Sequence, residues 1–140
     1  MTLDEAVDLV IFAFLNGCNG DILVQKAAAT TIEVLAEAVK RLFNYQKSDR
    51  IIGLRHGEKN YETLLTDEEC FHAIDMGDFY RVPCDKRDLN YEKYLDDGTE
   101  RSWLTQFNSN NTKLLTVEET MEKLMTVKEI REEVEKWKKQ

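Results

Sequence analysis

The sequence predicts a domain of the α/β class with α+β character. Three observations support this class: an amphipathic N-terminal segment, two short apolar runs bounded by turn residues, and helical patterns towards the C-terminus. With 140 residues, the chain fits one domain on the prior of roughly 100–200 residues per domain. A chain of this length buries enough surface to form a core without metals or disulfides.

Residues 1–15 are expected to form the first helix. Thr2 and Glu5 have the spacing of a capping box, in which each side chain accepts the other residue's backbone amide. Apolar residues recur at helical spacing along the segment, at Leu3, Val7, Val10, Ile11 and Phe14. The Asn19-Gly20 pair then supplies the positive-φ positions that a chain reversal requires.

A strand, a helix and a second strand are expected next. Residues 21–25 and 50–54 are short apolar runs, which we interpret as buried strands. Residues 31–43 carry one apolar stripe, and Thr30 and Glu33 have capping-box spacing at its start. Strand, helix and strand with short connections predict a parallel, right-handed βαβ unit.

The second half of the chain has a less regular pattern. Residues 61–65 are expected to form a strand, residues 66–76 a short helix, and residues 79–82 a strand that Pro83 ends. Residues 85–111 lose periodicity, which is unusual in a compact domain and indicates either function or packing against another part. Capping boxes introduce the short helix and two C-terminal helices, at Thr66 with Glu69, Thr116 with Glu119, and Thr126 with Glu129.

No cofactor cradle is encoded in these residues. The sequence contains no GxGxxG, no Walker A motif and no Tyr-x-x-x-Lys. Two or three strands are also too few for an open parallel sheet that is covered on both faces. We therefore expect the βαβ unit to be the end of a larger sheet, with no cofactor held on this chain.

Charge and cysteine content limit the partners and the compartment. The net charge of −8 makes nucleic acid and anionic membranes poor partners, although a few cations in a pocket can still bind a small anion. No run approaches the ~20 apolar residues of a membrane span, and no signal peptide is expected. The cysteines, Cys18, Cys70 and Cys84, form neither a CxxC pair nor a zinc pattern. We expect them to be buried, inert thiols in a reducing cytoplasm, with no metal site.

The loop that begins at Arg55 is the best candidate site. It follows a predicted strand, at the sheet edge where open α/β folds bind ligands. Arg55 offers a planar, bidentate donor for a diphosphate, Lys59 adds a cation, and Glu58 can accept hydroxyl hydrogen bonds or orient the arginine. The alternative is a solvated turn with a weak Arg–Glu pair, which spacing alone slightly favours.

Two neighbouring features complete the candidate site. Gln25 and Lys26 end the first predicted strand at the same edge, where the simple interpretation is a surface lysine after a strand. If Gln25, Lys26 and Arg55 converged on one phosphate-sized site, a ligand-binding role for these residues would be favoured over the simple interpretation. His56 has no evident nucleophile beside it, so a positioning or structural role is favoured over a role in acid–base catalysis.

Several strings in the chain resemble the C-terminal half of a known enzyme family. They are TLDEAVDLVIFAF, NGDILVQKAAATTIEVLAEAV, IIGLRHGEKNYETLLT, GDFYRVPCDKRDLNYEKY and FNSNNTKLL. The family comprises the capsular polysaccharide biosynthesis enzymes. Its members are UDP-N-acetylglucosamine 4,6-dehydratases, often also 5-epimerases, and UDP-glucose 4-epimerase-like proteins of the extended short-chain dehydrogenase/reductase type.

The resemblance implies a two-part enzyme. In the full-length family a Rossmann half holds NAD(P) and the catalytic Tyr/Lys pair, and the C-terminal part closes over the UDP-sugar. The resemblance thus implies that residues 1–115 are a UDP-sugar-binding domain and residues 116–140 are C-terminal helices, without the Rossmann half and without catalytic residues. We expect a truncated, split or excised product that works with a Rossmann-domain partner or as a homo-oligomer.

The resemblance also implies roles for individual residues. Arg55 matches the arginine that clamps the diphosphate, Glu58 the acid near the nucleoside, and Gln25 and Lys26 the segment that lines the uridine pocket. Residues 87–94 resemble the C-terminal extension of the capsule subgroup. Relatives commonly carry proline at the position of Ala28. Two functions stay open: a UDP-sugar-binding portion that is inactive alone, and a non-catalytic remnant or interaction module.

Overall fold

The computed structural model describes residues 1–84 and 106–139, which divide into two compact units. The first unit contains residues 1–27 and 61–112, and the second contains residues 28–60 and 113–140. The chain is of the α+β type, because its helices accompany small antiparallel sheets. This agrees with the predicted α/β class of α+β character. The predicted resemblance of residues 87–94 lies outside the described residues.

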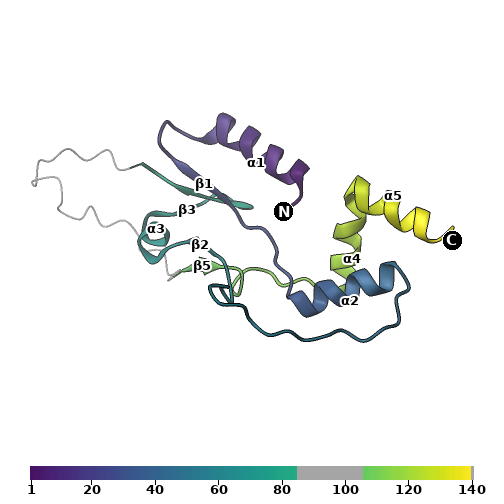
Figure 1. Ribbon diagram of the computed structural model, residues 1–140. Coiled ribbons are helices and arrows are strands. Elements are labelled where there is room, and N and C mark those ends of the chain that lie inside the picture. Colours follow the sequence, from purple (N-terminus) through teal and green to yellow (C-terminus); the bar gives the residue numbers. More distant parts are fainter. Residues whose placement is uncertain (85–105, 140) are drawn as a thin grey trace, which may run out of the picture. The chain divides into compact units, whose positions relative to one another are not determined.

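Helix α1 (Leu3–Asn16) opens the first unit and has the predicted cap (Figure 1). The Thr2 hydroxyl accepts the Glu5 amide at 3.2 Å, and the Glu5 carboxylate accepts the Thr2 amide at 2.7 Å. Phe12 stacks on Phe79 with ring centroids 4.0 Å apart. No residue of α1 is buried, so most of its apolar side chains remain exposed.

Three strands form an antiparallel sheet in the first unit, so the predicted parallel βαβ unit is wrong. The sheet contains β1 (Ile22–Gln25), β4 (Phe79–Val82) and β3 (Ile74–Asp75), in the order β1-β4-β3. Gly77, with φ at 80°, turns the chain between β3 and β4. This tight hairpin supplies β4 as an antiparallel neighbour for β1, and no crossover helix is needed.

A second small sheet and a short helix enclose the core of the first unit. Strand β2 (Thr63–Leu65) pairs antiparallel with β5 (Phe107–Asn108), and α3 (Asp67–His72) follows β2. The Thr66–Glu69 capping box of α3 is present, although the helix ends before the predicted residue 76. The core consists of the buried side chains of Leu65, Cys70, Val82 and Phe107, with Val24, Ala73 and Tyr80 packed against them.

The second unit is built from three helices. Its elements are α2 (Ile32–Leu42), α4 (Val117–Thr126) and α5 (Lys128–Trp137), with Ala38, Thr120 and Val134 buried. The Thr116–Glu119 capping box of α4 is present as predicted.

Two predicted caps in this unit are wrong. Thr31, not Thr30, is the N-cap of α2, because its hydroxyl accepts the Val34 amide at 3.2 Å. Thr30 lies one residue before this N-cap, and its hydroxyl is 3.3 Å from that of Thr120. The N-cap of α5 is Val127, which provides no side-chain cap, so Thr126 does not start that helix.

Residues 50–54 form no strand, which corrects the second buried strand of the prediction. They belong to the long segment without helix or strand that follows α2 in Figure 1. The Ile51 side chain is 94% exposed, and Ile52 and Leu54 are also exposed. Gly53 has a positive φ of 72°, which breaks the extended conformation in the middle of the run. Apolar composition alone therefore did not make this segment a strand.

Among the residues that the structure describes, no helix is long and apolar enough to cross a membrane. The predicted functional division at residue 115 stays a prediction. The structural division is of another kind, because residues 28–60 and 113–140 pack together as one unit.

Candidate functional site

Lys26 follows β1 and is held by three contacts within the first unit. Its ammonium lies 2.6 Å from the Asp75 carboxylate and 4.2 Å from the centroid of the Tyr80 ring. Its backbone amide donates to the Asp78 carbonyl at 2.9 Å. Lys26 therefore differs from the surface lysine of the simple interpretation, since its stem is mostly covered and its charge is placed over an aromatic face.

The partner carboxylate of Lys26 is kept ionised. The pKa of Asp75 is lowered from its ordinary value of 3.8, first by the hydrogen bond from Lys26 and next by the Gly77 amide. The Gly77 amide lies 2.9 Å from the same carboxylate oxygen that receives Lys26. An anionic ligand that approached Lys26 would compete with this carboxylate.

Gln25 carries an unusual polar atom. Its side-chain Oε1 is shielded from solvent and accepts no hydrogen bond from any residue that the structure describes. A buried acceptor without a donor destabilises a protein by about 1–3 kcal/mol. This atom is next in sequence to Lys26, and an N–H or O–H group of a ligand would reach it only if the side chains around it moved.

Arg55 and Glu58 form a solvated turn in the second unit. The Arg55 amide donates to the Glu58 carboxylate at 2.8 Å, and the Glu58 amide donates back to the Arg55 carbonyl at 3.1 Å. Gly57 adopts a φ of 87°, and open space surrounds it. Glu58 thus shapes the backbone of the loop, and the solvated turn is the alternative that spacing alone slightly favoured.

The guanidinium of Arg55 is only weakly engaged. Its Nε lies 3.9 Å from the Glu58 carboxylate, which is beyond hydrogen-bond distance, and the side chain is 75% exposed. An exposed pair with this geometry contributes little to stability. The guanidinium is therefore largely exposed to solvent, where an anion can reach it.

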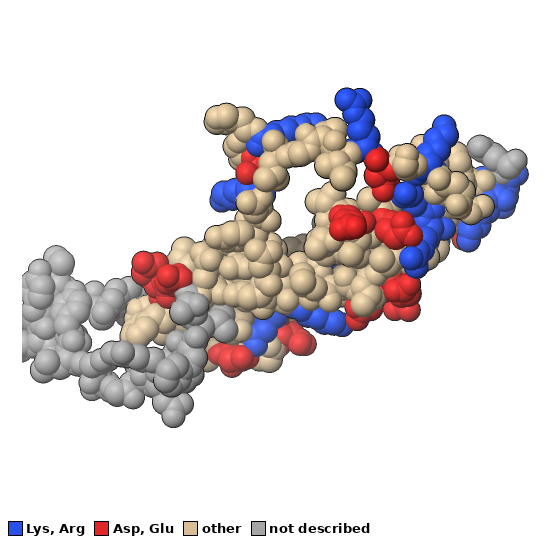
Figure 2. Space-filling model, turned by 90° about the horizontal axis from the view of Figure 1, so that it is seen from below, with Lys and Arg blue, Asp and Glu red and all other residues tan. Residues whose placement is uncertain are grey.

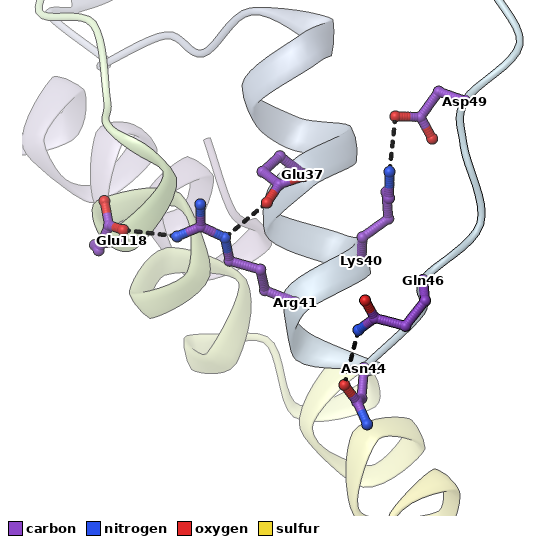
Figure 3. Close-up of polar contacts among 7 residues, drawn as sticks. All are labelled: Glu37, Lys40, Arg41, Asn44, Gln46, Asp49 and Glu118. Atoms are coloured by element: carbon purple, nitrogen blue, oxygen red, sulfur yellow. Dashed lines mark hydrogen bonds and ion pairs between the residues drawn. The ribbon is translucent and has the colours of Figure 1, made fainter.

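The cations of α2 differ from Arg55 in this respect. Figure 3 shows Arg41 between two carboxylates, 2.7 Å from Glu37 and 2.9 Å from Glu118. Lys40 lies 3.1 Å from Asp49. The pKa of Arg41 is raised, first by the hydrogen bond with Glu37. These cations are already neutralised, which leaves Arg55 the better anion ligand of the three.

The surface around α2 offers little room for a large ligand. A shallow pocket of about 170 Å³ is lined by Glu37, Lys40, Arg41, Tyr45 and Gln46. Ligand pockets usually measure roughly 300–1,000 Å³. On the face drawn in Figure 2, basic and acidic side chains lie beside one another over the helices of this unit. Neither observation favours this region as a nucleotide site.

The four predicted site residues form two local pairs. Gln25 and Lys26 are adjacent in the first unit, and Arg55 and Glu58 share a turn in the second. Their convergence on one ligand stays a prediction, as do their individual roles. His56 is exposed on the same turn as Arg55.

Sequence reasoning missed two residues and misjudged two cysteines. Asp75 and Tyr80 hold Lys26, and the only signal for them was the turn sequence around Gly77, which brings β3 against β4. Cys70 is buried as expected, and burial raises the pKa of its thiol. Cys18 is exposed and Cys84 half-buried, so the prediction of buried thiols is wrong for both. Within residues 1–84 and 106–139, no cluster of three His, Cys, Asp or Glu side chains could hold a metal.

These features define an α+β protein with a polar strand end and an arginine-bearing turn. Comparison with family models matches residues 1–84 to "Polysaccharide biosynthesis protein" and residues 85–131 to "Polysaccharide biosynthesis protein C-terminal". The chain therefore belongs to the polysaccharide biosynthesis protein family and corresponds to its C-terminal part, as the resemblance implied.

Curated relatives share this region at high identity. The chain is 49% identical over 135 residues to a UDP-glucose 4-epimerase of Rickettsia rickettsii (strain Sheila Smith), covering 96% of this chain and 40% of the relative. The corresponding protein of Rickettsia felis (strain ATCC VR-1525 / URRWXCal2) is 48% identical with the same coverage. The chain thus spans about 40% of the length of these relatives.

A solved structure has the same fold over most of the chain. The X-ray structure of Pen from Bacillus thuringiensis matches with a TM-score of 0.68 and 24% identity. The match covers 90% of this chain and 36% of Pen. This likeness supports the α+β fold and carries no argument about activity.

Proposed function

We propose that this chain is the nucleotide-sugar-binding portion of a polysaccharide biosynthesis enzyme of the 4-epimerase or 4,6-dehydratase type. The observation that carries the proposal is the match of 96% of the chain to UDP-glucose 4-epimerases at nearly half identity. The ligand class is a UDP-sugar, which a member of such a family would bind through its diphosphate and its base.

The chemistry of the two residue pairs supports this ligand class. The exposed guanidinium of Arg55 can donate two parallel hydrogen bonds to a diphosphate. The unsatisfied Oε1 of Gln25, once a movement of its neighbours exposes it, can accept the imide N–H of uracil or a sugar hydroxyl. Lys26, the next residue in sequence, adds a positive charge once a phosphate displaces Asp75.

The chain is proposed to be inactive alone. Hydride transfer needs NAD(P) and an acid–base pair, for which the sequence holds neither a GxGxxG motif nor a Tyr-x-x-x-Lys. We expect both to come from a Rossmann domain that corresponds to the remaining length of the relatives. The residues of this chain would bind and orient the UDP-sugar against that domain.

Calorimetric titration of the chain with UDP tests the binding proposal. Arg55→Ala should weaken binding by about 10- to 100-fold, as expected for the loss of a charge-assisted hydrogen bond worth roughly 1.5–3 kcal/mol. Arg55→Lys should recover only part of the affinity, because an ammonium cannot bind a diphosphate in bidentate fashion. Arg50→Ala is the matched control, since Arg50 is an exposed arginine of the same segment. Equal affinity of Arg55→Ala and the wild-type chain would refute the assigned role.

A second candidate function is a non-catalytic interaction module. The exposed apolar face of α1 favours it, because such a face is typical of a protein-binding surface. Turnover separates the two candidates. The catalytic proposal expects conversion of a UDP-sugar when the chain is combined with a Rossmann half of the family and none without it. Failure of every reconstituted pair would favour the interaction module.

A further inference from the structure

The turn between α1 and β1 brings two cysteines to one buried carboxylate. The side chain of Asp21 is 1% exposed. Its oxygens accept the Cys18 amide at 2.7 Å and the Cys84 amide at 3.2 Å, although the two cysteines are far apart in sequence. A single carboxylate therefore holds the backbones of both residues, one before β1 and the other after β4.

The Cys84 side chain, which follows β4, packs against this same turn. Its Sγ is 3.3 Å from the Asn19 carbonyl, which belongs to the residue that follows Cys18. A Cβ on Gly20 would lie 2.8 Å from the Cys84 Cβ and 3.2 Å from its Sγ. Only glycine leaves space for the thiol at this point. The turn is thus packed directly against the sulfur of Cys84.

Arg81 provides a positive charge beside the turn. Its Nε lies 2.6 Å from the Asp21 carboxylate. The pKa of Arg81 is raised, first by the hydrogen bond with Asp21 and in smaller part by interaction with the Cys18 side chain. The thiolate is the form of a cysteine that attacks disulfides. Cys18 is also the exposed member of the pair, so a small oxidant reaches it.

We propose that Cys18 and Cys84 form a redox modification site, at which a low-molecular-mass disulfide such as glutathione disulfide drives a reversible intramolecular disulfide. The Cys18 thiolate attacks one sulfur of glutathione disulfide, so that a Cys18–glutathione bond forms and one glutathione thiolate leaves. The Cys84 thiol loses its proton to water and attacks the Cys18 sulfur, which releases the second glutathione. Two protein thiols are oxidised and one glutathione disulfide is reduced to two thiols.

The structure shows the reduced state, with both thiols free. Closing the bond requires the Cβ atoms to come within about 3.5–4.5 Å. The glycines on either side of Cys18, Gly17 and Gly20, give the exposed turn the backbone freedom for that adjustment. The disulfide would covalently join the entry to β1 with the exit from β4, so oxidation would fix this end of the sheet.

The test is mass spectrometry of the whole chain after incubation in glutathione buffers of increasing oxidation and blocking of free thiols with N-ethylmaleimide. The expected product is a cross-link between the tryptic peptide that ends at Lys26 and the peptide that follows Arg81, which glutathione reverses. Cys70 should remain alkylatable after unfolding, since its thiol is buried.

Two variants keep the proposal falsifiable. Cys84→Ser should stop at the Cys18–glutathione mixed disulfide, and Cys18→Ser should show no modification at all. Cys70→Ser is the matched control and should give the same cross-link as the wild-type chain. A wild-type chain that accumulates only the mixed disulfide, or only dimers joined through Cys18, would overturn the proposal.

Discussion

The ammonium of Lys26 lies 2.6 Å from the Asp75 carboxylate, which also accepts the Gly77 amide at 2.9 Å. This pair connects the end of β1 to β3, two strands of the sheet that do not pair directly. The same pair lowers the net positive charge at the candidate site. The Asp75 carboxylate already binds the lysine that the sequence assigned to a ligand. Two variants can separate these structural and binding roles.

We predict that Asp75→Asn increases the affinity for UDP several-fold, because it frees the Lys26 ammonium for a phosphate. Lys26→Ala should reduce the affinity about 10-fold, and the double variant should behave like Lys26→Ala. Calorimetry with UDP measures all three. The change in unfolding free energy should stay at about 0–1 kcal/mol, since the carboxylate is exposed. If Asp75→Asn weakened UDP binding as much as Lys26→Ala, the role of Asp75 would be to position the lysine. This result would contradict the competition between Asp75 and phosphate for Lys26.

The helix caps of the second unit provide a matched comparison of two threonines. The Thr116 hydroxyl accepts the Glu119 amide at 3.2 Å, and the Glu119 carboxylate accepts the Thr116 amide at 2.9 Å. The Thr126 hydroxyl instead donates to the Lys123 carbonyl at 2.8 Å and caps nothing. Thr116→Ala should lower the free energy of unfolding by about 1 kcal/mol, and Thr126→Ala by less than about 0.5 kcal/mol. Urea unfolding followed by circular dichroism checks both values, and equal losses would show that the capping box contributes no particular stability.

The capping boxes also explain what the sequence could predict of this fold. A box depends on residues three positions apart, so the pairs Thr2–Glu5, Thr66–Glu69 and Thr116–Glu119 were found without any knowledge of tertiary structure. Thr126 with Glu129 has the same spacing, but α4 continues through Thr126, and its hydroxyl is used there. Spacing therefore identifies candidates, and the position of the helix end decides among them.

Strand pairing could not be predicted in the same way. The residues of β1 were correctly assigned to a strand, but its partner β4 lies more than fifty residues later and was not evident from local pattern. Residues 50–54 have a comparable apolar composition and form no strand. Pairing depends on which edges meet in space, and a single sequence contains that information only indirectly.

The candidate site was predictable as far as residue type and local turns allow. The turn at Gly57 and the exposure of Arg55 follow from the glycine and from the polar loop around it. The contacts of Lys26 with Asp75 and Tyr80 span about fifty residues and needed the structure. Because the fold brings such distant charges together, the sequence did not reveal Asp75 as the partner of Lys26. The lysine was therefore assigned to a ligand.

Asp21 leads to a prediction about pH. Its pKa is held below the ordinary value of 3.8, first by the Cys18 amide and further by the Cys84 amide and by Arg81. The unfolded state therefore binds more protons than the folded state, and stability rises with pH in this range. The contribution of Asp21 is complete above its unfolded pKa near 3.8 and is lost as the pH falls through the lower folded value.

Asp21→Asn should lower the urea midpoint of unfolding at about pH 7, and the gap between the variant and the wild-type chain should narrow below about pH 4. Urea titrations of both chains over this range provide the measurement. Asp67→Asn, an exposed acidic residue at the start of α3, is the control and should not reproduce this pH dependence. A difference in midpoint that stayed constant with pH would show that the stability contributed by Asp21 does not depend on the ionisation of its carboxylate.

The last prediction concerns the apolar face of α1. Val7, Val10, Phe14 and Leu15 are all exposed, and together with Leu3 they make a surface that water solvates poorly. The isolated chain should therefore associate with itself as its concentration rises, or be only marginally stable. Val10→Glu combined with Phe14→Glu should abolish the association, because burying two carboxylates in an apolar contact is strongly unfavourable. Asp8→Ala, at an exposed polar position of the same helix, should leave the self-association unchanged. Sedimentation velocity over a range of concentrations distinguishes these cases, and a wild-type chain that stayed a stable monomer throughout would show that this face needs no cover.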